Sequence, residues 1–271
     1  MDHPACEPSP TEFFFAHAHA AAAALKLAYA LEQGHELALL VGEPGLGKSR
    51  LLRQATANAA AAGDAVVDVY FSRLDADSLL AFLEGELAQR DDAKQPMSRA
   101  AGCRTDSLQP IARHVRRLSD AGRGIVIAID DAHLIRDPAV FETLQLLLNL
   151  RDREHARLTI LLAGQRSLLA DLSRTPALAQ RVAVTASLAP LDVGSTSQYV
   201  QARLQFDHDG EIAINDDAVE LLHDAACGVP RHIDRLCAMA RLIAELDNRC
   251  RISVADVGEV ALELGLRDAA A

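Results

Sequence analysis

Eight consecutive residues match the phosphate-loop pattern G-x-x-x-x-G-K-[ST]. They are Gly42, Glu43, Pro44, Gly45, Leu46, Gly47, Lys48 and Ser49. The glycines allow the backbone to curl so that consecutive N–H groups face a phosphate, and a following helix adds the positive end of its dipole. In this pattern Lys48 reaches the β- and γ-phosphates and Ser49 supplies a hydroxyl to Mg²⁺, with Arg50 next to them. We therefore predict a site for a nucleoside triphosphate and Mg²⁺.

Lysine is rare in this chain, which makes its place in the loop informative. The only lysines are Lys26, Lys48 and Lys94, and the rest of the 27 basic residues are arginines. A chance match to the whole pattern has odds on the order of one in a thousand. The motif also lies between an expected strand and an expected helix, as phosphate binding requires.

Two consecutive carboxylates follow a second apolar run, 125–129. A carboxylate at the end of a buried strand is costly unless a metal or hydrogen bonds satisfy it, and a phosphate-bound Mg²⁺ would do so. We assign Asp130 to Mg²⁺ and Asp131 to polarising the attacking water. Asp131 is one methylene shorter than the glutamate usual there, so we expect slow or partner-dependent hydrolysis. The DDAH tetrapeptide at 130–133 resembles that of DEAH helicases, but those need two core domains and this chain has room for one.

Short apolar runs alternate with stretches of helical spacing over the first 190 residues. Strands are expected over 36–41, 64–71, 124–129, 157–164 and 182–186. Helices are expected over 13–31, from the phosphate loop to about 61, over 76–89, over 107–120 and after Pro138, with a loop over 90–105. This alternation predicts an α/β three-layer sandwich, with a five-stranded parallel sheet covered on both faces.

The character of the chain changes near residue 190, where strands stop and three or four helices are expected to follow. Capping boxes are predicted at Ser195 with Gln198 and at Ser253 with Asp256, and Asn215 is a candidate cap between them. We therefore expect a nucleotide-binding core with its N-terminal helix over 1–190 and a small all-α lid domain over 191–271.

Composition excludes several classes of protein. The 271 residues carry a net charge of −11, and 50% are hydrophobic. The hydrophobic content predicts a sizeable apolar core and disfavours a disordered chain. The negative net charge disfavours a protein that coats nucleic acid and a polybasic membrane-binding protein. Residues 191–271 hold 7 basic and 15 acidic side chains, so most of the negative charge belongs to the expected lid.

The N-terminal stretch and the distribution of cysteines predict a cytoplasmic location without membrane insertion. The Ala-rich stretch 13–31 is preceded by acidic residues and by no Lys or Arg, unlike a signal peptide, and His17, His19 and Lys26 interrupt it. The five cysteines are scattered and never form C-x-x-C, which fits a reduced compartment and no zinc framework.

The phosphate loop, the aspartate-ended strand and the helical tail together resemble an AAA+ ATPase. Three stretches narrow the resemblance to the general secretion pathway A-component, or ExeA, type. These are LLAGQRSL at 161–168, LAQRVAV at 178–184 followed by LAPLD, and GVPRHIDRLC at 228–237. The resemblance covers about residues 13–265 and only the ATPase part, because such relatives usually continue into a membrane helix and a periplasmic part.

The resemblance implies ATP as the nucleotide and roles for three further residues. Gln165 would lie beside the γ-phosphate and hold the water, Arg181 would reach a neighbouring subunit's nucleotide, and Arg231 would contact phosphate from the lid. Each also has a structural interpretation: a strand-end cap, a surface ion pair and a pair with a lid carboxylate, respectively. The implied protein is a Mg²⁺-dependent ATPase that forms a homo-oligomer with ATP and acts on an unidentified protein partner in secretion or pilus-type assembly.

Two alternative functions stay open. GEPGLGKSRLL with IDDAHLI is also similar to slow nucleotide-switch regulators, which bind nucleotide tightly and turn it over slowly. The ATPase-only length is similar to that of transposition-helper ATPases, which associate with DNA. Arg113, Arg116 and Arg117 share one helical face that could contact phosphates, although such faces are more often solvated, so DNA is the less favoured partner.

Overall fold

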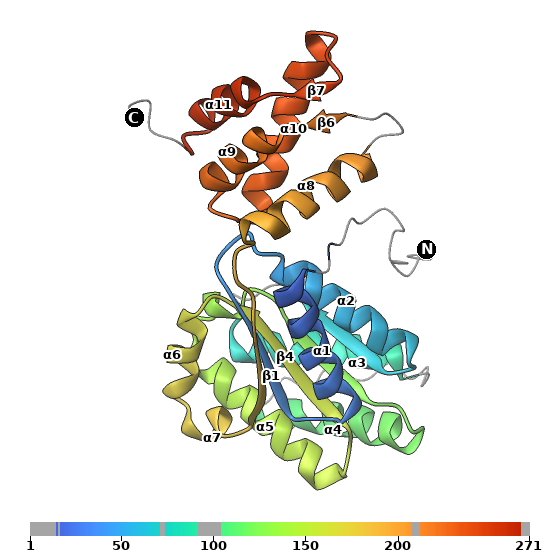
Figure 1. Cartoon of the computed structure of the whole chain (residues 1–271). Coiled ribbons are helices and arrows are strands. Elements are labelled where there is room, and N and C mark those ends of the chain that lie inside the picture. The colour runs from blue at the N-terminus through green and yellow to red at the C-terminus, as the bar shows by residue number, and fades with distance from the viewer. Residues whose placement is uncertain (1–14, 16, 71–73, 92–103, 208–211, 267–271) are drawn as a thin grey trace. The chain divides into compact units, whose positions relative to one another are not determined.

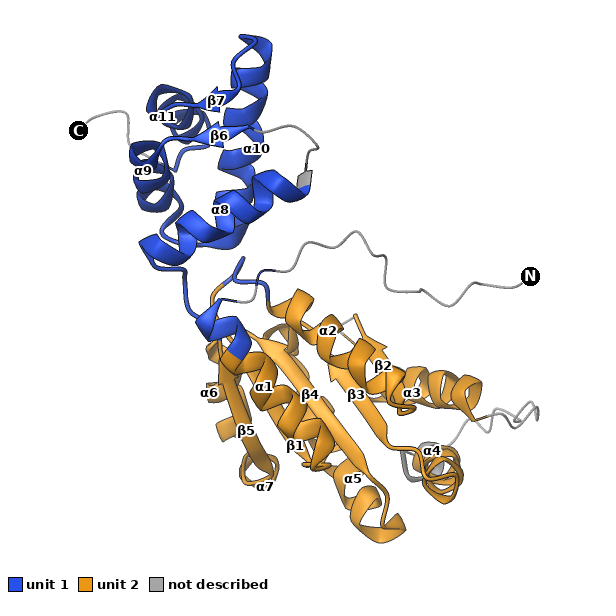
Figure 2. Cartoon of the chain, turned by 45° about the vertical axis from the view of Figure 1, so that its right-hand side comes forward, with its two compact units in different colours: residues 1–21, 44–47, 188–271 blue, residues 22–43, 48–187 orange. Residues whose placement is uncertain are grey.

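The structure, a computed structural model, describes residues 15, 17–70, 74–91, 104–207 and 212–266. The chain separates into two compact units (Figure 2). The core unit comprises Ala22–Glu43 and Lys48–Ser187. The C-terminal unit comprises Leu188–Ala271 together with Pro44–Gly47 and the N-terminal residues up to Ala21. Most of the loop expected over 90–105 lies outside the described residues.

The core unit is built on the predicted five-stranded sheet. Its strands are β1 (Leu37–Val41), β2 (Ala65–Val69), β3 (Ile125–Ile129), β4 (Leu158–Gly164) and β5 (Val182–Ser187). Their order is β2-β3-β4-β1-β5 (Figure 2), and every pairing is parallel. This sheet with its flanking helices confirms the predicted fold class (Figure 1). β1, β3 and β4 are buried along their whole length, as expected from runs that are apolar except for Thr159 in β4. β5 forms an edge, so its burial alternates.

Helices connect the strands and cover the sheet. They are α1 (Ala18–Glu32), α2 (Lys48–Ala61), α3 (Ala76–Arg90), α4 (Arg104–Asp120), α5 (Pro138–Glu154), α6 (Ser167–Ser173) and α7 (Pro176–Ala179), with a 3-10 turn η1 (Ala132–Leu134) after β3. Asp75 caps α3 and Asp137 caps α5 through side-chain bonds to backbone N–H groups.

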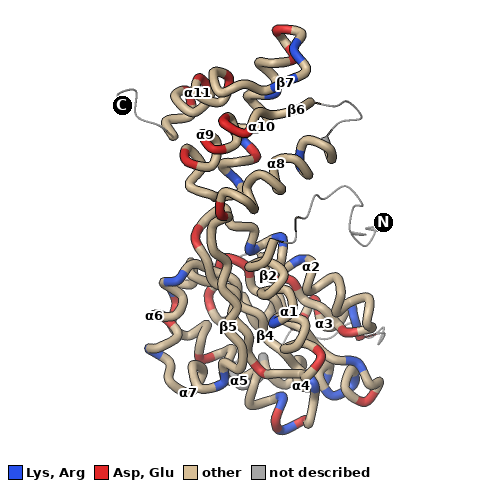
Figure 3. The backbone as a smooth tube through the Cα atoms, viewed as in Figure 1, with Lys and Arg blue, Asp and Glu red and all other residues tan. Residues whose placement is uncertain are grey.

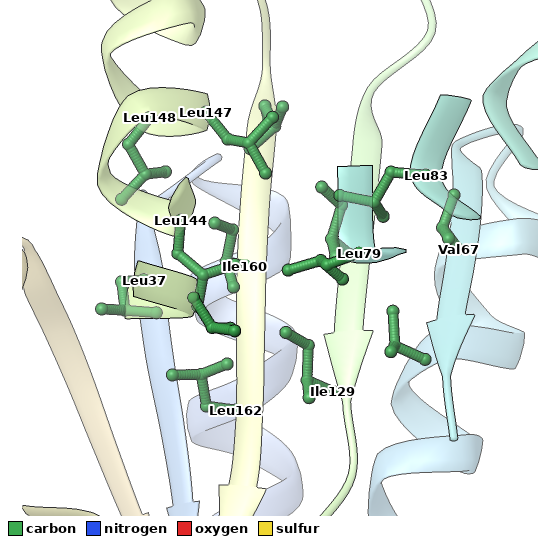
Figure 4. Close-up of a cluster of buried hydrophobic side chains, with 14 of the residues drawn as sticks. Leu37, Val67, Leu79, Leu83, Ile129, Leu144, Leu147, Leu148, Ile160 and Leu162 are labelled. Carbon is green, nitrogen blue, oxygen red and sulfur yellow. The ribbon is translucent and has the colours of Figure 1, made fainter. Parts of the chain in front are cut away.

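The main apolar core lies between one face of the sheet and α3, α4 and α5. Alternate strand residues such as Val67, Ile129 and Ile160 meet Leu79 and Leu144 from the helices (Figure 4). These five side chains are at most 2% exposed. α2 packs against β1 to β4. Because both faces are covered, the carboxyl ends of the strands are left to carry polar groups.

The C-terminal unit is mainly helical. It contains α8 (Val193–Asp207), α9 (Asp216–Ala226), α10 (Pro230–Leu246) and α11 (Val254–Glu263). The expectation that strands stop is wrong, because β6 (Ala213–Ile214) pairs in parallel with β7 (Arg251–Ile252). A strand of two residues is too short to show the alternation of apolar and polar residues by which a strand is recognised in a sequence.

Helix caps in this unit follow the sequence only in part. The box predicted at Ser195 is wrong: α8 begins earlier, and Asp192 accepts from the Ser195 backbone N–H at 2.6 Å. The box of Ser253 and Asp256 is confirmed, with both reciprocal bonds present. Asn215 occupies the N-cap position of α9 without a side-chain cap bond.

The capping carboxylate of Asp256 also holds Arg249 through two hydrogen bonds of 2.8 and 2.7 Å. These bonds lower the pKa of Asp256 below its ordinary value of 3.8. A lowered folded-state pKa stabilises the fold above the unfolded pKa, and this stabilisation is lost as the pH falls below about 4. Asp256→Asn is therefore expected to lower the melting temperature at pH 7 by roughly 5 °C.

The measurement is calorimetry of the full chain at pH 7 and pH 3. Asp247→Asn is the matched control, because Asp247 also contacts Arg249 but is 61% exposed. The difference between wild type and Asp256→Asn should shrink at pH 3. A difference that is absent, or equal at both pH values, contradicts the assignment.

Among the described helices, none combines the length and the hydropathy needed to cross a bilayer.

Candidate nucleotide site

The predicted phosphate loop joins the end of β1 to the start of α2. Gly45 and Gly47 have φ values of +85° and +91°, which favour glycine. Lys48 is only 7% exposed, and its Nζ donates to the Glu43 carbonyl oxygen at 2.9 Å. The ammonium is thus held against the backbone of its own loop. Arg50 lies in the first turn of α2 and is partly exposed.

Ser49 and Asp130, the two predicted Mg²⁺ ligands, line one cavity of about 240 Å³. The parallel pairing explains this: Asp130 follows β3, and its backbone N–H bonds to the carbonyl of Val69 at the end of β2. Among the described residues, no cluster of three His, Cys, Asp or Glu side chains could hold a metal by itself. A hydroxyl and one carboxylate fit Mg²⁺, which usually retains waters and substrate phosphates as its remaining ligands.

Asp68 in β2 lines the same cavity, although no sequence motif singles it out. Its pKa is raised, mainly because burial disfavours the charged carboxylate. The available signal was a single acid inside the apolar run of β2. Register places Asp68 opposite Ala128, two residues before Asp130.

Asp131 has left-handed backbone angles, φ 48° and ψ 35°, which aspartate tolerates better than most residues. Its backbone N–H donates to the Asp130 carboxylate at 2.8 Å. The turn therefore separates the two acids: Asp130 is half-buried, and the side chain of Asp131 is 56% exposed. This separation is compatible with Asp130 as a metal ligand and Asp131 as the acid that faces a water molecule.

Gln165 follows β4, the strand between β3 and β1. The carbonyl of the preceding Gly164 accepts from the Gly42 N–H at 3.2 Å, which ties the end of β4 to the start of the phosphate loop. The Gln165 side chain hydrogen-bonds to His133 at 3.0 Å. The loop, the two acids and Gln165 therefore converge at the carboxyl edge of the sheet.

Arg181 does not share that edge. It directly precedes β5, so it lies at the amino ends of the strands. Its guanidinium bonds to Glu36 at 3.3 Å, Asp152 at 3.1 Å and Asn149 at 2.7 Å. Within one chain Arg181 is therefore remote from the phosphate loop, and it is held by acceptors of its own subunit.

Arg231 begins α10 after Pro230. Its backbone N–H donates to the Gly45 carbonyl at 3.3 Å, within the C-terminal unit. A Cβ on Gly45 would lie 2.8 Å from Val229 and 3.1 Å from the Arg231 Cβ, so this approach needs glycine. The Arg231 side chain is exposed.

Two of the three arginines considered for DNA contact are engaged within the chain. Arg116 donates to both carboxylate oxygens of Glu154 at 2.7 and 3.0 Å, and Arg117 pairs with Asp91 at 3.2 Å. These pairs offset most of the positive charge on that face of α4.

Solved structures with similar folds include the AAA+ proteins Cdc6, ORC2 and RuvB. Cdc6p of Pyrobaculum aerophilum superimposes with a TM-score of 0.72 and 19% identity, covering 94% of this chain and 69% of that one. The Aeropyrum pernix ORC2 protein superimposes at 0.67 and 18%, covering 94% and 69%. The Thermotoga maritima RuvB Holliday junction branch migration motor gives 0.60 and 20%, covering 90% and 67%. At these identities the similarity concerns the fold alone.

Sequence comparison agrees with the fold. General secretion pathway protein A of Aeromonas hydrophila is 30% identical over 255 residues, which cover 89% of this chain and 43% of that protein. This chain thus spans less than half the length of that relative. A family profile described as "AAA domain" matches residues 31–172. The chain therefore belongs to the AAA+ family of P-loop ATPases.

Proposed function

We propose that this protein binds ATP with Mg²⁺ and hydrolyses it, coupling its nucleotide state to a protein partner. The observation that carries the proposal is the shared cavity of Ser49 and Asp130 beside the loop of Lys48. Two residues far apart in sequence meet where the metal of a phosphate loop is needed. Bound Mg²⁺ would neutralise charge on the phosphates.

The residues at the carboxyl edge then have distinct roles. Lys48 binds the β- and γ-phosphates, and Asp131 accepts the proton of the attacking water. The water oxygen bonds to the γ-phosphorus, the bond from that phosphorus to the β–γ bridging oxygen breaks, and ADP leaves with its electron pair. Gln165 orients the water. Arg231 would contact the phosphates from the C-terminal unit.

The position of Arg181 supports action on a second subunit. An arginine opposite the transferred phosphoryl group accelerates the reaction, and within one chain Arg181 lies at the other edge of the sheet. In a homo-oligomer the Arg181 side chain would reach the nucleotide of the neighbouring subunit once its ion pairs with Glu36 and Asp152 are broken. We propose such assembly in the ATP-bound state, in the cytoplasm.

Charge guides the choice of partner. The C-terminal unit displays many acidic residues on its helices (Figure 3), and its region 191–271 carries 15 acidic against 7 basic residues. Such a surface attracts a basic protein segment and repels DNA. Together with the relative named for the general secretion pathway, this favours a protein partner in secretion or pilus-type assembly.

Light scattering and an ATPase assay, run together across protein concentration with and without ATP, test the proposal. We expect assembly with ATP and turnover per subunit that rises with concentration. Tight ATP binding with turnover no faster than nucleotide release would instead identify a slow nucleotide switch, which the short Asp131 side chain favours as the second candidate. Salt-dependent binding to duplex DNA in the presence of ATP would identify the DNA-associated alternative.

Arg181→Ala is expected to leave ATP binding by the isolated subunit unchanged and to lower the assembly-stimulated turnover by roughly 1,000-fold. Glu36 keeps a second cation, Arg151, at 3.3 Å, and Asp152 is 52% exposed to solvent, so the substitution leaves no buried acid uncompensated. Arg174→Ala is the matched control, because Arg174 is 79% exposed and its ion pair is with nearby Asp171. If turnover of Arg181→Ala still rises fully with concentration, the trans role is wrong.

A further inference from the structure

The side chain of His133 hydrogen-bonds to Gln165 and faces Asp131. It lies in η1, between the aspartate turn and the end of β4, and is only 11% exposed. Its Nε2 lies 3.0 Å from the Gln165 amide nitrogen, and its Nδ1 faces the Asp131 carboxylate at 3.9 Å. Within the described part of the chain, this buried Nδ1 has no hydrogen-bond partner.

The backbone holds the imidazole close to β4. A Cβ built on Gly164 would lie 3.1 Å from the His133 backbone nitrogen and 3.3 Å from its Cβ, so a larger residue would crowd η1. The Leu134 N–H bonds to the Asp131 carbonyl, and the Leu168 N–H bonds to the Gln165 carbonyl, which fixes both turns. The ring therefore has little freedom to leave Gln165.

The neighbours of the His133 ring determine which of its two nitrogens carries the proton. Nδ1 lies 3.9 Å from the Asp131 carboxylate, too far for a hydrogen bond, but the negative charge favours a proton on the imidazole nitrogen that faces it. Nε2 is then an acceptor, which matches the amide nitrogen of Gln165 as donor. With its amide nitrogen held by His133, Gln165 turns its carbonyl oxygen away from the ring.

We propose that His133 is a positioning residue whose Nε2 accepts from the Gln165 amide and whose proton lies on Nδ1, so that the ring fixes the amide orientation of Gln165 beside Asp131. The carbonyl oxygen of Gln165 is thereby free to accept a hydrogen from the attacking water whose other hydrogen faces Asp131. This role rests on the proposed ATPase function. It extends that function by linking the water-holding amide to the acid through one buried ring.

Three substitutions separate positioning from simple packing. His133→Gln can place an acceptor near the position of Nε2 and keep the Gln165 contact, whereas His133→Asn reaches only the position of Nδ1. We expect His133→Asn and His133→Ala to lower kcat by about 10–100-fold with KM unchanged. His133→Gln should recover most of the wild-type kcat. Thermal stabilisation by ATP shows in each variant that the nucleotide site is folded.

A double substitution tests whether His133 acts through Gln165. If it does, His133→Ala combined with Gln165→Ala should be no slower than Gln165→Ala alone. Additive losses, or an equal kcat in His133→Gln and His133→Ala, would contradict the proposal. An increase of KM in step with a decrease of kcat would show that the ring supports nucleotide binding instead.

The tautomer can be measured without any turnover. Long-range ¹H–¹⁵N spectra of the full chain, assigned by comparison with His133→Gln, should show His133 protonated at Nδ1 only. Protonation at Nε2 would overturn the proposal. If the wild type binds ATP but hydrolyses none, the proposed function fails, and this spectrum still decides the arrangement of His133 and Gln165.

Discussion

Lys48→Ala is expected to abolish ATP hydrolysis and to weaken ATP binding by roughly 100-fold or more. The ammonium is the buried cation of the phosphate loop, 7% exposed and held 2.9 Å from the Glu43 carbonyl oxygen. Each hydrogen bond to a charged group contributes about 1.5–3 kcal/mol, so losing two to the phosphates accounts for that change in affinity. Titration with a fluorescent ATP analogue and a phosphate-release assay measure the two quantities.

Lys26→Ala is the matched control, because Lys26 is an exposed lysine of the same core unit whose Nζ donates to a strand carbonyl, that of Thr185, at 3.4 Å. It removes the same charge and should leave binding and turnover unchanged. Wild-type turnover in purified, folded Lys48→Ala would refute the site.

Asp131→Asn is expected to bind ATP as the wild type does and to lose hydrolysis by about 100- to 10,000-fold, the range attributed to a general base. The amide keeps the shape of the side chain, and asparagine also tolerates left-handed backbone angles, so the turn should persist. What disappears is the group that accepts the proton of water. Single-turnover hydrolysis and equilibrium binding, measured on the same preparation, separate the two effects.

Two further variants make this result specific. Glu142→Gln removes an exposed carboxylate on α5 and should change nothing. Asp130→Asn should lower the affinity for Mg²⁺, so excess Mg²⁺ should restore part of its activity but none of the activity of Asp131→Asn. Equal rescue of both variants would show that the two acids share the metal, and the division of roles would then be wrong.

Local signals were sufficient for the strands of the core. The run ELALLV predicted β1, and GIVIAI predicted β3, because strands buried on both faces must be apolar along their whole length. The short pair β6 and β7 was missed because two residues carry no periodicity. The true start of α8 was also missed, since serine, threonine and aspartate near a helix start compete as caps.

Contacts between distant residues could not be predicted from the sequence. The resemblance placed Gln165 near the phosphate loop, but only the neighbouring strands β1 and β4 explain why. The pairing of β2 with β3 places Asp68 in the cavity that Ser49 and Asp130 also line. The acceptors of Arg181 lie 29 to 145 residues away in sequence, so no local pattern reveals them.

The sequence by itself determined that this chain is a P-loop protein with a parallel sheet and an acid-ended strand. The phosphate loop is one contiguous segment whose glycines and lysine act locally, so its pattern is sufficient to identify it. The tertiary structure decided which side chains share the site. The order β2-β3-β4-β1-β5 brings the ends of separate strands together, and so sets His133 against Gln165 and Arg181 at the opposite edge. Strand order depends on packing across the whole sheet, which no single segment encodes.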